Sequence, residues 1–207
     1  TELKAHSNSI HATERIASLL LECGEYADCL FYYRKLSELS PESYEIFNNL
    51  GLVYFYLENF EKAKSAFNRS MQLNPKFASV RCNIGCLFEA LGEDDNAIEY
   101  YKSSIVLDSE CWNAHENLAD LLFKHKRFEE ALGHYQVILS DSRPEIDVLL
   151  KLANTLHKLG RFASAEKIYQ EIVTASPEKK EAFNNQKRKF LTGTVHVCIA
   201  SMMISVY

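Results

Sequence analysis

Two pairs of residues have the spacing of metal ligands on one face of a helix. Cys82 and Cys86 are four residues apart, and so are Cys111 and His115. Side chains at i and i+4 lie side by side on a helix, so each pair could hold a metal ion from one side. A structural zinc site needs four ligands, however, and the chain contains no Cys-x-x-Cys pair to supply the others. We therefore predict no metal site.

The sequence also lacks the patterns that accompany catalysis. It contains no glycine-rich phosphate loop, no Gly-x-Ser-x-Gly and no His-Glu-x-x-His. The seven histidines are scattered, and no pair of carboxylates stands apart from ordinary charges on helix surfaces. We predict no catalytic residue, no cofactor and no enzyme activity in this chain.

The composition is ordinary for a folded chain and excludes several classes of protein. Of 207 residues, 47% are hydrophobic and 25% are charged, with only seven Gly and four Pro. These values argue against collagen-like and disordered chains. The 23 basic and 28 acidic residues leave a net charge of −5, so the chain has no excess of cations to replace the counterions of a nucleic acid. We predict no nucleic-acid partner.

The termini and the cysteines predict a location. Thr1-Glu2-Leu3-Lys4 has no apolar stretch of a signal peptide, and the six cysteines suit a reducing compartment with free thiols. We predict a cytoplasmic location, and the basic run Lys187-Arg188-Lys189 leaves the nucleus as an alternative. Because no initiator Met is present, we also expect a fragment or a trimmed product.

A 34-residue repeat organises the chain. Each unit has a small residue at its eighth position, at Ala17, Gly51, Gly85, Ala119 and Ala153. Each also has an aromatic residue sixteen positions later, at Tyr33, Phe67, Tyr101, Tyr135 and Tyr169. Apolar residues in between recur every three or four positions, which is the periodicity of a helix. We expect these aromatic residues to form the core.

Every unit is predicted to be a hairpin of two helices. The first helices are expected at 10–23, 44–57, 78–91, 112–125 and 146–159. The second helices are expected at 27–40, 61–74, 95–108, 129–141 and 163–176. Gly24, Gly92 and Gly160 lie where a left-handed residue commonly ends a helix. The paired small residues let the two helices approach closely, and stacking of hairpins must bury the remaining apolar faces.

These residues resemble the tetratricopeptide repeat family. The resemblance covers 10–179 and implies an all-α, right-handed superhelix of five helix-turn-helix repeats plus a broken sixth. The predicted organisation is a lead-in at 1–9, units at 10–43, 44–77, 78–111, 112–145 and 146–179, and an atypical segment at 180–207. In this family the first helices line a concave groove that binds a partner peptide or helix.

The resemblance implies groove residues at fixed slots of the first helices. They are Asn48, Asn49, Phe55, Asn83, Glu116, Asn117, Asp120, Lys151 and Asn154. Glu14 and Ser18 occupy slots where a receptor of chaperone tails has Lys and Asn, so that type of groove is disfavoured. The series Asn49, Asn83 and Asn117 is similar instead to the asparagine ladder of O-linked N-acetylglucosamine transferases. We expect these amides to be exposed, either as a ladder for a peptide backbone or as polar residues on a solvated face.

Two classes of function follow from the resemblance. The first is a protein-interaction scaffold within a multiprotein assembly, which adds the cilium as an alternative location. The second is the substrate-recruiting arm of a larger enzyme such as an O-linked N-acetylglucosamine transferase. Sequence beyond Asn185 of a longer parent protein would separate them.

The C-terminal tail departs from the repeat. Lys187 takes the slot that Gly51 has in the second unit, and the residues from Leu191 onward are apolar and β-branched. From Val195 the tail is too short to span a membrane. It could fold back over the fifth repeat, form a sticky disordered end that drives self-association, or be an alternative C-terminus of a longer repeat protein. We favour the last.

Overall fold

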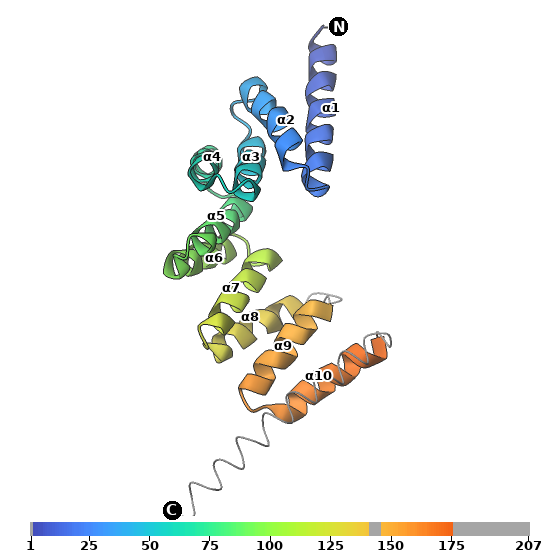
Figure 1. Ribbon diagram of the computed structural model, residues 1–207, viewed down its shortest axis with the longest axis vertical. Coiled ribbons are helices and arrows are strands. Elements are labelled where there is room, and N and C mark those ends of the chain that lie inside the picture. Colours follow the sequence, from blue (N-terminus) through green and yellow to red (C-terminus); the bar gives the residue numbers. More distant parts are fainter. Residues whose placement is uncertain (1, 141–145, 176–207) are drawn as a thin grey trace, which may run out of the picture. The chain divides into compact units, whose positions relative to one another are not determined.

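The computed structural model describes residues 2–140 and 146–175 (Figure 1). In these residues it contains ten α-helices and no strand. They are α1 (Glu2–Glu22), α2 (Tyr26–Leu39), α3 (Tyr44–Tyr56), α4 (Phe60–Leu73), α5 (Ala78–Ala90), α6 (Asp94–Leu107), α7 (Trp112–Lys124), α8 (Phe128–Ser140), α9 (Ile146–Lys158) and α10 (Phe162–Ala175). The predicted all-α class is confirmed. The tail and the broken sixth repeat, 180–207, lie outside the described residues.

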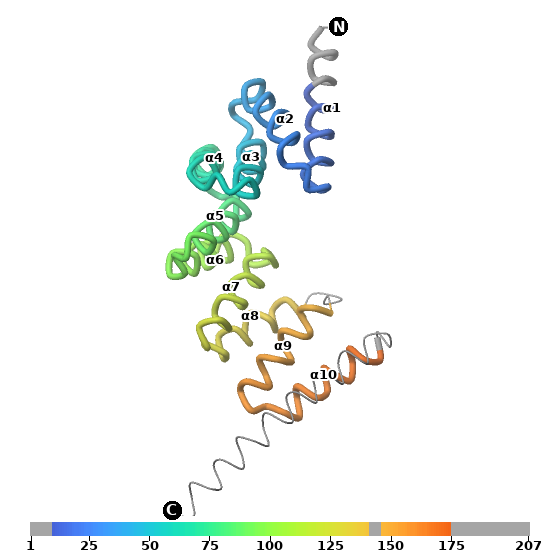
Figure 2. The backbone as a smooth tube through the Cα atoms, in the orientation of Figure 1, coloured from blue at the N-terminus to red at the C-terminus, as the bar shows by residue number. Residues whose placement is uncertain are grey.

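The helices follow one another as hairpins within two compact units, Thr1–Leu121 and Leu122–Tyr207. In the first unit α1 packs on α2, α3 on α4 and α5 on α6, and α2 and α4 each contact the helix that follows (Figure 2). In the second unit α9 packs on both α8 and α10. Successive hairpins therefore stack within each unit, as the repeat requires.

The first helix is longer than the repeat pattern predicts. It begins at Glu2, eight residues before the predicted start at residue 10. Residues 2–22 contain neither Gly nor Pro, so nothing in this stretch interrupts the helix. The other nine helices begin within one residue of their predicted starts.

Two residues after the end of every first helix comes a residue with left-handed backbone. These residues are 34 positions apart: Gly24 (φ 78°), Glu58 (φ 56°), Gly92 (φ 76°), Lys126 (φ 61°) and Gly160 (φ 74°). After each of them the next backbone N–H donates back to a carbonyl five residues earlier, as Glu93 does to Phe88 at 2.9 Å. This is the hydrogen bond of a Schellman C-cap. The three predicted glycine caps are confirmed. In the second and fourth repeats Glu58 and Lys126 make the same turn although they carry side chains.

The hairpin core is built on contacts between a glycine and a ring. A Cβ atom on Gly85 would lie 2.5 Å from Cε1 of Tyr101, and one on Gly51 would lie 2.4 Å from Cδ1 of Phe67. Both rings are fully buried at 0% exposure. The predicted close crossing of the two helices is therefore confirmed, because the ring of the second helix occupies the space of the missing side chain.

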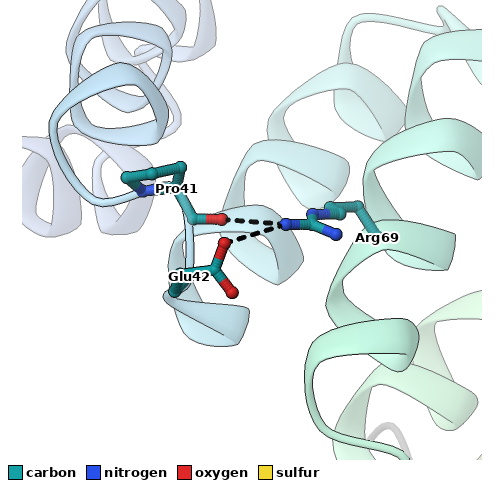
Figure 3. Close-up of polar contacts among 3 residues, drawn as sticks. All are labelled: Pro41, Glu42 and Arg69. Carbon is teal, nitrogen blue, oxygen red and sulfur yellow. Dashed lines mark hydrogen bonds and ion pairs between the residues drawn. The ribbon is translucent and has the colours of Figure 1, made fainter.

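Polar side chains of α4 hold the second hairpin together and link it to the first. Ser70 on α4 is buried and donates to the carbonyl of Tyr44 at 2.8 Å. Arg69 turns the other way and reaches the loop between α2 and α3 (Figure 3). Its Nη2 lies 3.3 Å from the carbonyl oxygen of Pro41 and 3.2 Å from Oε1 of Glu42. Because Arg69 contacts the end of the first repeat, it links α4 to the neighbouring hairpin.

Candidate peptide-binding face

The predicted groove residues lie on the first helices of four hairpins. In the first unit Asn48, Asn49 and Phe55 are on α3, Asn83 is on α5, and Glu116, Asn117 and Asp120 are on α7. In the second unit Lys151 and Asn154 are on α9.

The amide row consists of Asn48, Asn49, Asn83 and Asn117, which lie on the first helices of the second, third and fourth repeats. Asn49 donates from Nδ2 to the hydroxyl of Tyr33 at 3.1 Å, and its Oδ1 accepts from Nδ2 of Asn48 at 3.2 Å. Asn48 in turn accepts at Oδ1 from Nδ2 of Asn83 at 2.8 Å. These hydrogen bonds therefore connect α2, α3 and α5 through four side chains.

Asn117 continues the series with different partners. Its Nδ2 lies 3.2 Å from Sγ of Cys86 and 3.7 Å from Sγ of Cys82. Cys82 has the slot in the third repeat that Asn48 has in the second, so the contact between repeats is preserved while the acceptor changes from oxygen to sulfur. Asn49, Asn83 and Asn117 thus each donate toward the preceding repeat.

The burial of these amides corrects one expectation. The side chains were expected to be exposed, but Asn49, Asn83 and Asn117 are half-buried and the adjacent Asn48 is only 6% exposed. A half-buried amide that loses its partner leaves an unsatisfied polar group, which costs stability. The row therefore holds repeats together, and any ligand would meet it as a partly enclosed surface.

The second helices contribute hydroxyls that sequence reasoning missed. Tyr101 donates to Cys86 at 3.5 Å and to Glu89 at 2.9 Å, and Tyr169 donates to Oδ1 of Asn154 at 2.7 Å. Ser18 on α1 lies close enough to the Tyr33 hydroxyl to influence its pKa. Burial raises the pKa of Tyr33, Tyr101 and Tyr169, so all three hydroxyls keep their protons at neutral pH.

A fixed spacing identifies these pairs. Tyr33, Tyr101 and Tyr169 each follow their polar partner by fifteen residues. The second repeat has Phe67 and, fifteen residues earlier, Leu52. A hydroxyl therefore occurs where the first helix offers a polar group, and a bare ring occurs where it offers a leucine. Comparison of the repeats at this spacing could have found the pairs.

The remaining predicted residues differ in their surroundings. Phe55 is half-buried, and its ring packs edge to face with Tyr56 at 5.5 Å and tilts against Phe60 at 6.0 Å. Glu116 and Asp120 are half-buried on α7, and Lys151 is half-buried on α9. The structure thus brings together Asn48, Asn49 and Asn83 of the second and third repeats and keeps Phe55 on a separate aromatic cluster.

A cavity of about 580 Å³ lies between α3 and α4, away from the amide row. It is lined by Phe47, Leu50, Tyr54, Lys62, Ser65, Ala66, Asn68, Arg69 and Gln72. None of the predicted groove residues is among them. The described part of the chain contains no group of three His, Cys, Asp or Glu side chains that could hold a metal ion. Among the described helices none combines the length and the apolar character needed to cross a membrane.

Three family models match the chain. The model described as the tetratricopeptide repeat matches residues 44–77, and a second model with the same description matches residues 78–111. A model described as the fifth armadillo-repeat domain of TT21 matches residues 113–202.

Curated relatives are similar to most of the chain. BBSome complex member BBS4 of Bos taurus is 24% identical over 172 residues, which cover 83% of this chain and 33% of BBS4. Anaphase-promoting complex subunit CDC16 of Saccharomyces cerevisiae is 25% identical over 171 residues, 78% of this chain and 20% of CDC16. The chain therefore spans a third or less of the length of these relatives.

Solved structures share the fold. PilF of Pseudomonas aeruginosa has a TM-score of 0.73 at 15% identity and covers 96% of this chain and 99% of its own. YrrB, a repeat protein described as having an unusual peptide-binding site, has a TM-score of 0.63 at 18% identity and covers 88% of this chain and 98% of its own. In the structure of the Cut9–Hcn1 hetero-tetramer of the anaphase-promoting complex, the TM-score is 0.68 at 16% identity, with 81% of this chain and 34% of that chain covered.

Proposed function

We propose that this chain, which belongs to the tetratricopeptide repeat family, is part of a protein-interaction scaffold that holds an extended peptide of a partner protein. Two relatives are named as members of multiprotein complexes, the BBSome and the anaphase-promoting complex. A structural neighbour is described as a peptide-binding repeat protein. These names support a scaffold and a protein or peptide partner.

The amide row is the observation that carries the proposal. Asn83 and Asn117 each use Nδ2 to reach the preceding repeat. Among the hydrogen bonds of the described residues, none has Oδ1 of either residue as its acceptor. An amide oxygen can accept two hydrogen bonds, so both residues keep an acceptor for the backbone N–H of an extended chain. Because one hydrogen bond already holds each amide, the acceptors are preorganised, which lowers the entropy lost on binding.

Neighbouring side chains would then select the peptide. Glu116 and Asp120 lie on the same helix as Asn117 and favour basic residues in the partner. Phe55 supplies an aromatic contact on α3, and in the second unit Lys151 and Asn154 are the groove residues that α9 offers. The backbone contacts would be blind to sequence, so these residues would carry the specificity.

A peptide library tests the proposal. The chain of 207 residues is used to select binders from random unstructured peptides on phage, and the best peptide is titrated by calorimetry. The double change Asn83→Ala and Asn117→Ala removes two acceptors and is expected to weaken binding by about 1–3 kcal/mol, at roughly 0.5–1.5 kcal/mol for each hydrogen bond. Asn96→Ala on the exposed surface of α6 is the matched control and should bind like the wild type.

Folding must be separated from binding in this test, because the same change removes contacts between repeats. Each variant is therefore titrated well below its own midpoint of thermal unfolding. At such a temperature essentially all of the protein is folded. Equal affinity of the double variant and the wild type would contradict a role for the amide row. Selection of no peptide at all would contradict the scaffold.

The location remains a proposal on the same basis. We favour the cytoplasm, with the nucleus and the cilium as alternatives, since one relative belongs to the anaphase-promoting complex and another to the BBSome. Imaging of the tagged full-length protein distinguishes these compartments.

A further inference from the structure

The second and third hairpins differ where Ala66 in one corresponds to Tyr100 in the other. In the third hairpin Tyr100 on α6 stacks on Phe88 of α5, with the ring centroids 5.3 Å apart and the planes inclined by 22°. In the second hairpin the corresponding residues are Ala66 on α4 and Tyr54 on α3. Ala66 has no ring to stack on Tyr54, and both residues line the cavity of about 580 Å³ between α3 and α4. The second hairpin therefore leaves a space beside its ring, whereas the third places an aromatic side chain there.

Ala66 is also the smallest residue at this position of the repeat. The other four repeats have larger side chains there, at Tyr32, Tyr100, His134 and Ile168. Protein interiors are packed nearly as densely as organic crystals, and atoms that line a void forfeit dispersion contacts. The volume of the cavity falls within the roughly 300–1,000 Å³ that small-ligand sites occupy. A side chain from a partner would restore the missing contacts, with Phe47, Leu50 and Tyr54 as the apolar wall.

The same cavity is positively charged. The described residues that line it include Lys62 and Arg69 but no Asp or Glu, although the whole chain has a net charge of −5. Nζ of Lys62 lies 5.6 Å from the ring centroid of Tyr54, and the guanidinium carbon of Arg69 lies 5.8 Å from that of Phe47. Arg69 is partly neutralised by Glu42 at 3.2 Å, whereas Lys62 is exposed to solvent. The cavity therefore combines an aromatic wall with positive charge.

The two cations are peculiar to the second repeat. The residues at the positions of Lys62 and Arg69 in the other repeats are Asp28 and Lys35, Asn96 and Ser103, Glu130 and Val137, and Ser164 and Glu171. The other hairpins form with neutral or acidic residues in place of Lys62, so the fold does not require a cation there. Complementary charge steers and selects binding partners. The cavity therefore suits a partner segment that carries carboxylates.

We propose that the cavity between α3 and α4 binds a Tyr or Phe side chain of a partner protein, within a segment rich in Asp and Glu. The partner's ring stacks on Tyr54 and occupies the space beside Ala66, as the ring of Tyr100 does in the third hairpin. Carboxylates on the neighbouring residues of the partner pair with Lys62 and Arg69. The site uses none of the amide row, whose residues do not line the cavity, so it goes beyond the proposed function.

Short labelled peptides test the proposal on the whole chain. The probe is fluorescein-Gly-Glu-Glu-Tyr-Glu-Glu-Gly, and its binding is measured by fluorescence anisotropy. Two matched peptides replace Tyr by Ala or every Glu by Lys. Each should bind at least roughly tenfold more weakly, since one loses the ring and the other reverses the charge. Affinity for the probe should also fall as salt is raised, because exposed charges are screened.

Two variants of the chain locate the site. Ala66→Tyr supplies the missing ring from within, as Tyr100 does in the third hairpin, and should weaken binding of the probe by roughly tenfold or more. Lys62→Glu reverses one charge and should also weaken binding. Lys102→Glu makes the same change on the exposed surface of α6 and is the matched control, with the affinity of the wild type. Circular dichroism shows which variants are folded, and if Ala66→Tyr is not, the exposed position 62 still decides.

The double variant with Asn83→Ala and Asn117→Ala separates this site from the amide row. It should bind the probe as the wild type does, because neither amide lines the cavity. Loss of binding in this variant would place the probe on the amide row and overturn the proposal, whether or not the amide row binds other peptides.

Other results would also overturn the proposal. They are no binding of the probe, equal binding of the peptide with Ala in place of Tyr, tighter binding of the lysine peptide, and unchanged affinity in a folded Ala66→Tyr or in Lys62→Glu. Binding that depends on the ring, on the carboxylates and on both positions of the chain would support it.

Discussion

Asn83 donates a hydrogen bond of 2.8 Å from Nδ2 to Oδ1 of Asn48, across the boundary between the second and third repeats. Asn48 is almost completely buried, so water cannot replace a lost partner at its oxygen. The stability of this boundary should therefore depend on both amides together.

A double-mutant cycle measures that dependence. Asn48→Ala and Asn83→Ala are made singly and together, and unfolding in urea gives the free energy of each variant. We expect a coupling of about 1 kcal/mol, which is typical of a hydrogen bond between neutral groups. The exposed Asn96→Ala serves as control and should change stability by less than about 0.5 kcal/mol. Additive effects of the two changes would show that the contact contributes nothing.

Adding one methyl group at Gly85 should destabilise the third hairpin. The new Cβ would lie 2.5 Å from a carbon of the buried Tyr101 ring, which cannot move without displacing its neighbours. Overpacking of this kind costs about 1–3 kcal/mol. Gly133→Ala on α8 is the matched control, since a Cβ there meets nothing within 4 Å, and it should stabilise by about 0.5–1 kcal/mol. Thermal unfolding followed by circular dichroism distinguishes the two, and equal midpoints would contradict the close crossing.

Glycine at position 58 should stabilise the protein. Glu58 has φ of 56°, a conformation that costs a residue with a Cβ roughly 1–2 kcal/mol. Glycine would remove this cost, but part of the stability gained is lost because glycine is more flexible in the unfolded chain. We expect Glu58→Gly to gain about 1 kcal/mol and the converse change Gly92→Ala to lose a similar amount. A lower melting temperature for Glu58→Gly would refute the explanation.

Mild acid should weaken the first unit through His115. The side chain is 5% exposed, and burial lowers its pKa below the ordinary value of 6.5, against the opposing effect of a hydrogen bond to the backbone of Ser109. Below 6.5 the unfolded state binds a proton that the folded state still excludes. Stability therefore rises with pH across the window beneath 6.5 and is lost as the pH falls through it.

The variant His115→Gln tests this effect, because glutamine has no proton to bind. The free energy of unfolding is measured at pH 7 and at mildly acidic pH for both proteins, and the variant should lose less stability than the wild type. His157, whose pKa is also lowered by burial, contributes equally to both proteins and cancels in the difference. The same pH dependence in both proteins would mean that His115 does not titrate as described.

The repeat made the hairpins predictable because their geometry depends on single positions. A glycine such as Gly85 every 34 residues leaves room for one ring, and the spacing alone indicates which helix supplies it. The start of α1 was not predictable in this way, because residues 2–9 lie outside the repeat and simply continue a helix that nothing interrupts.

The amide row was only half predictable. The spacing placed Asn49, Asn83 and Asn117 on equivalent helix positions, but it did not show that their Nδ2 atoms turn toward the preceding repeat. The direction of each Nδ2 atom depends on whether the neighbouring hairpin presents an oxygen, a hydroxyl or a sulfur within hydrogen-bonding distance. Burial follows from the same packing, and so the exposure of these side chains was overestimated.

The pairing of second-helix aromatics with first-helix partners limits how such a chain can be recombined. A helix that carries Tyr101 or Tyr169 brings a hydroxyl whose acceptors lie on the first helix, Cys86 and Glu89 for Tyr101 and Asn154 for Tyr169. If α4 with Phe67 were spliced into the fifth hairpin, Asn154 would lose its donor, and the reverse exchange would place a hydroxyl against Leu52. The smallest piece that can be shuffled, duplicated or grafted without leaving a polar group unsatisfied is therefore the whole hairpin, and crossovers are expected to be tolerated only in the loops between hairpins.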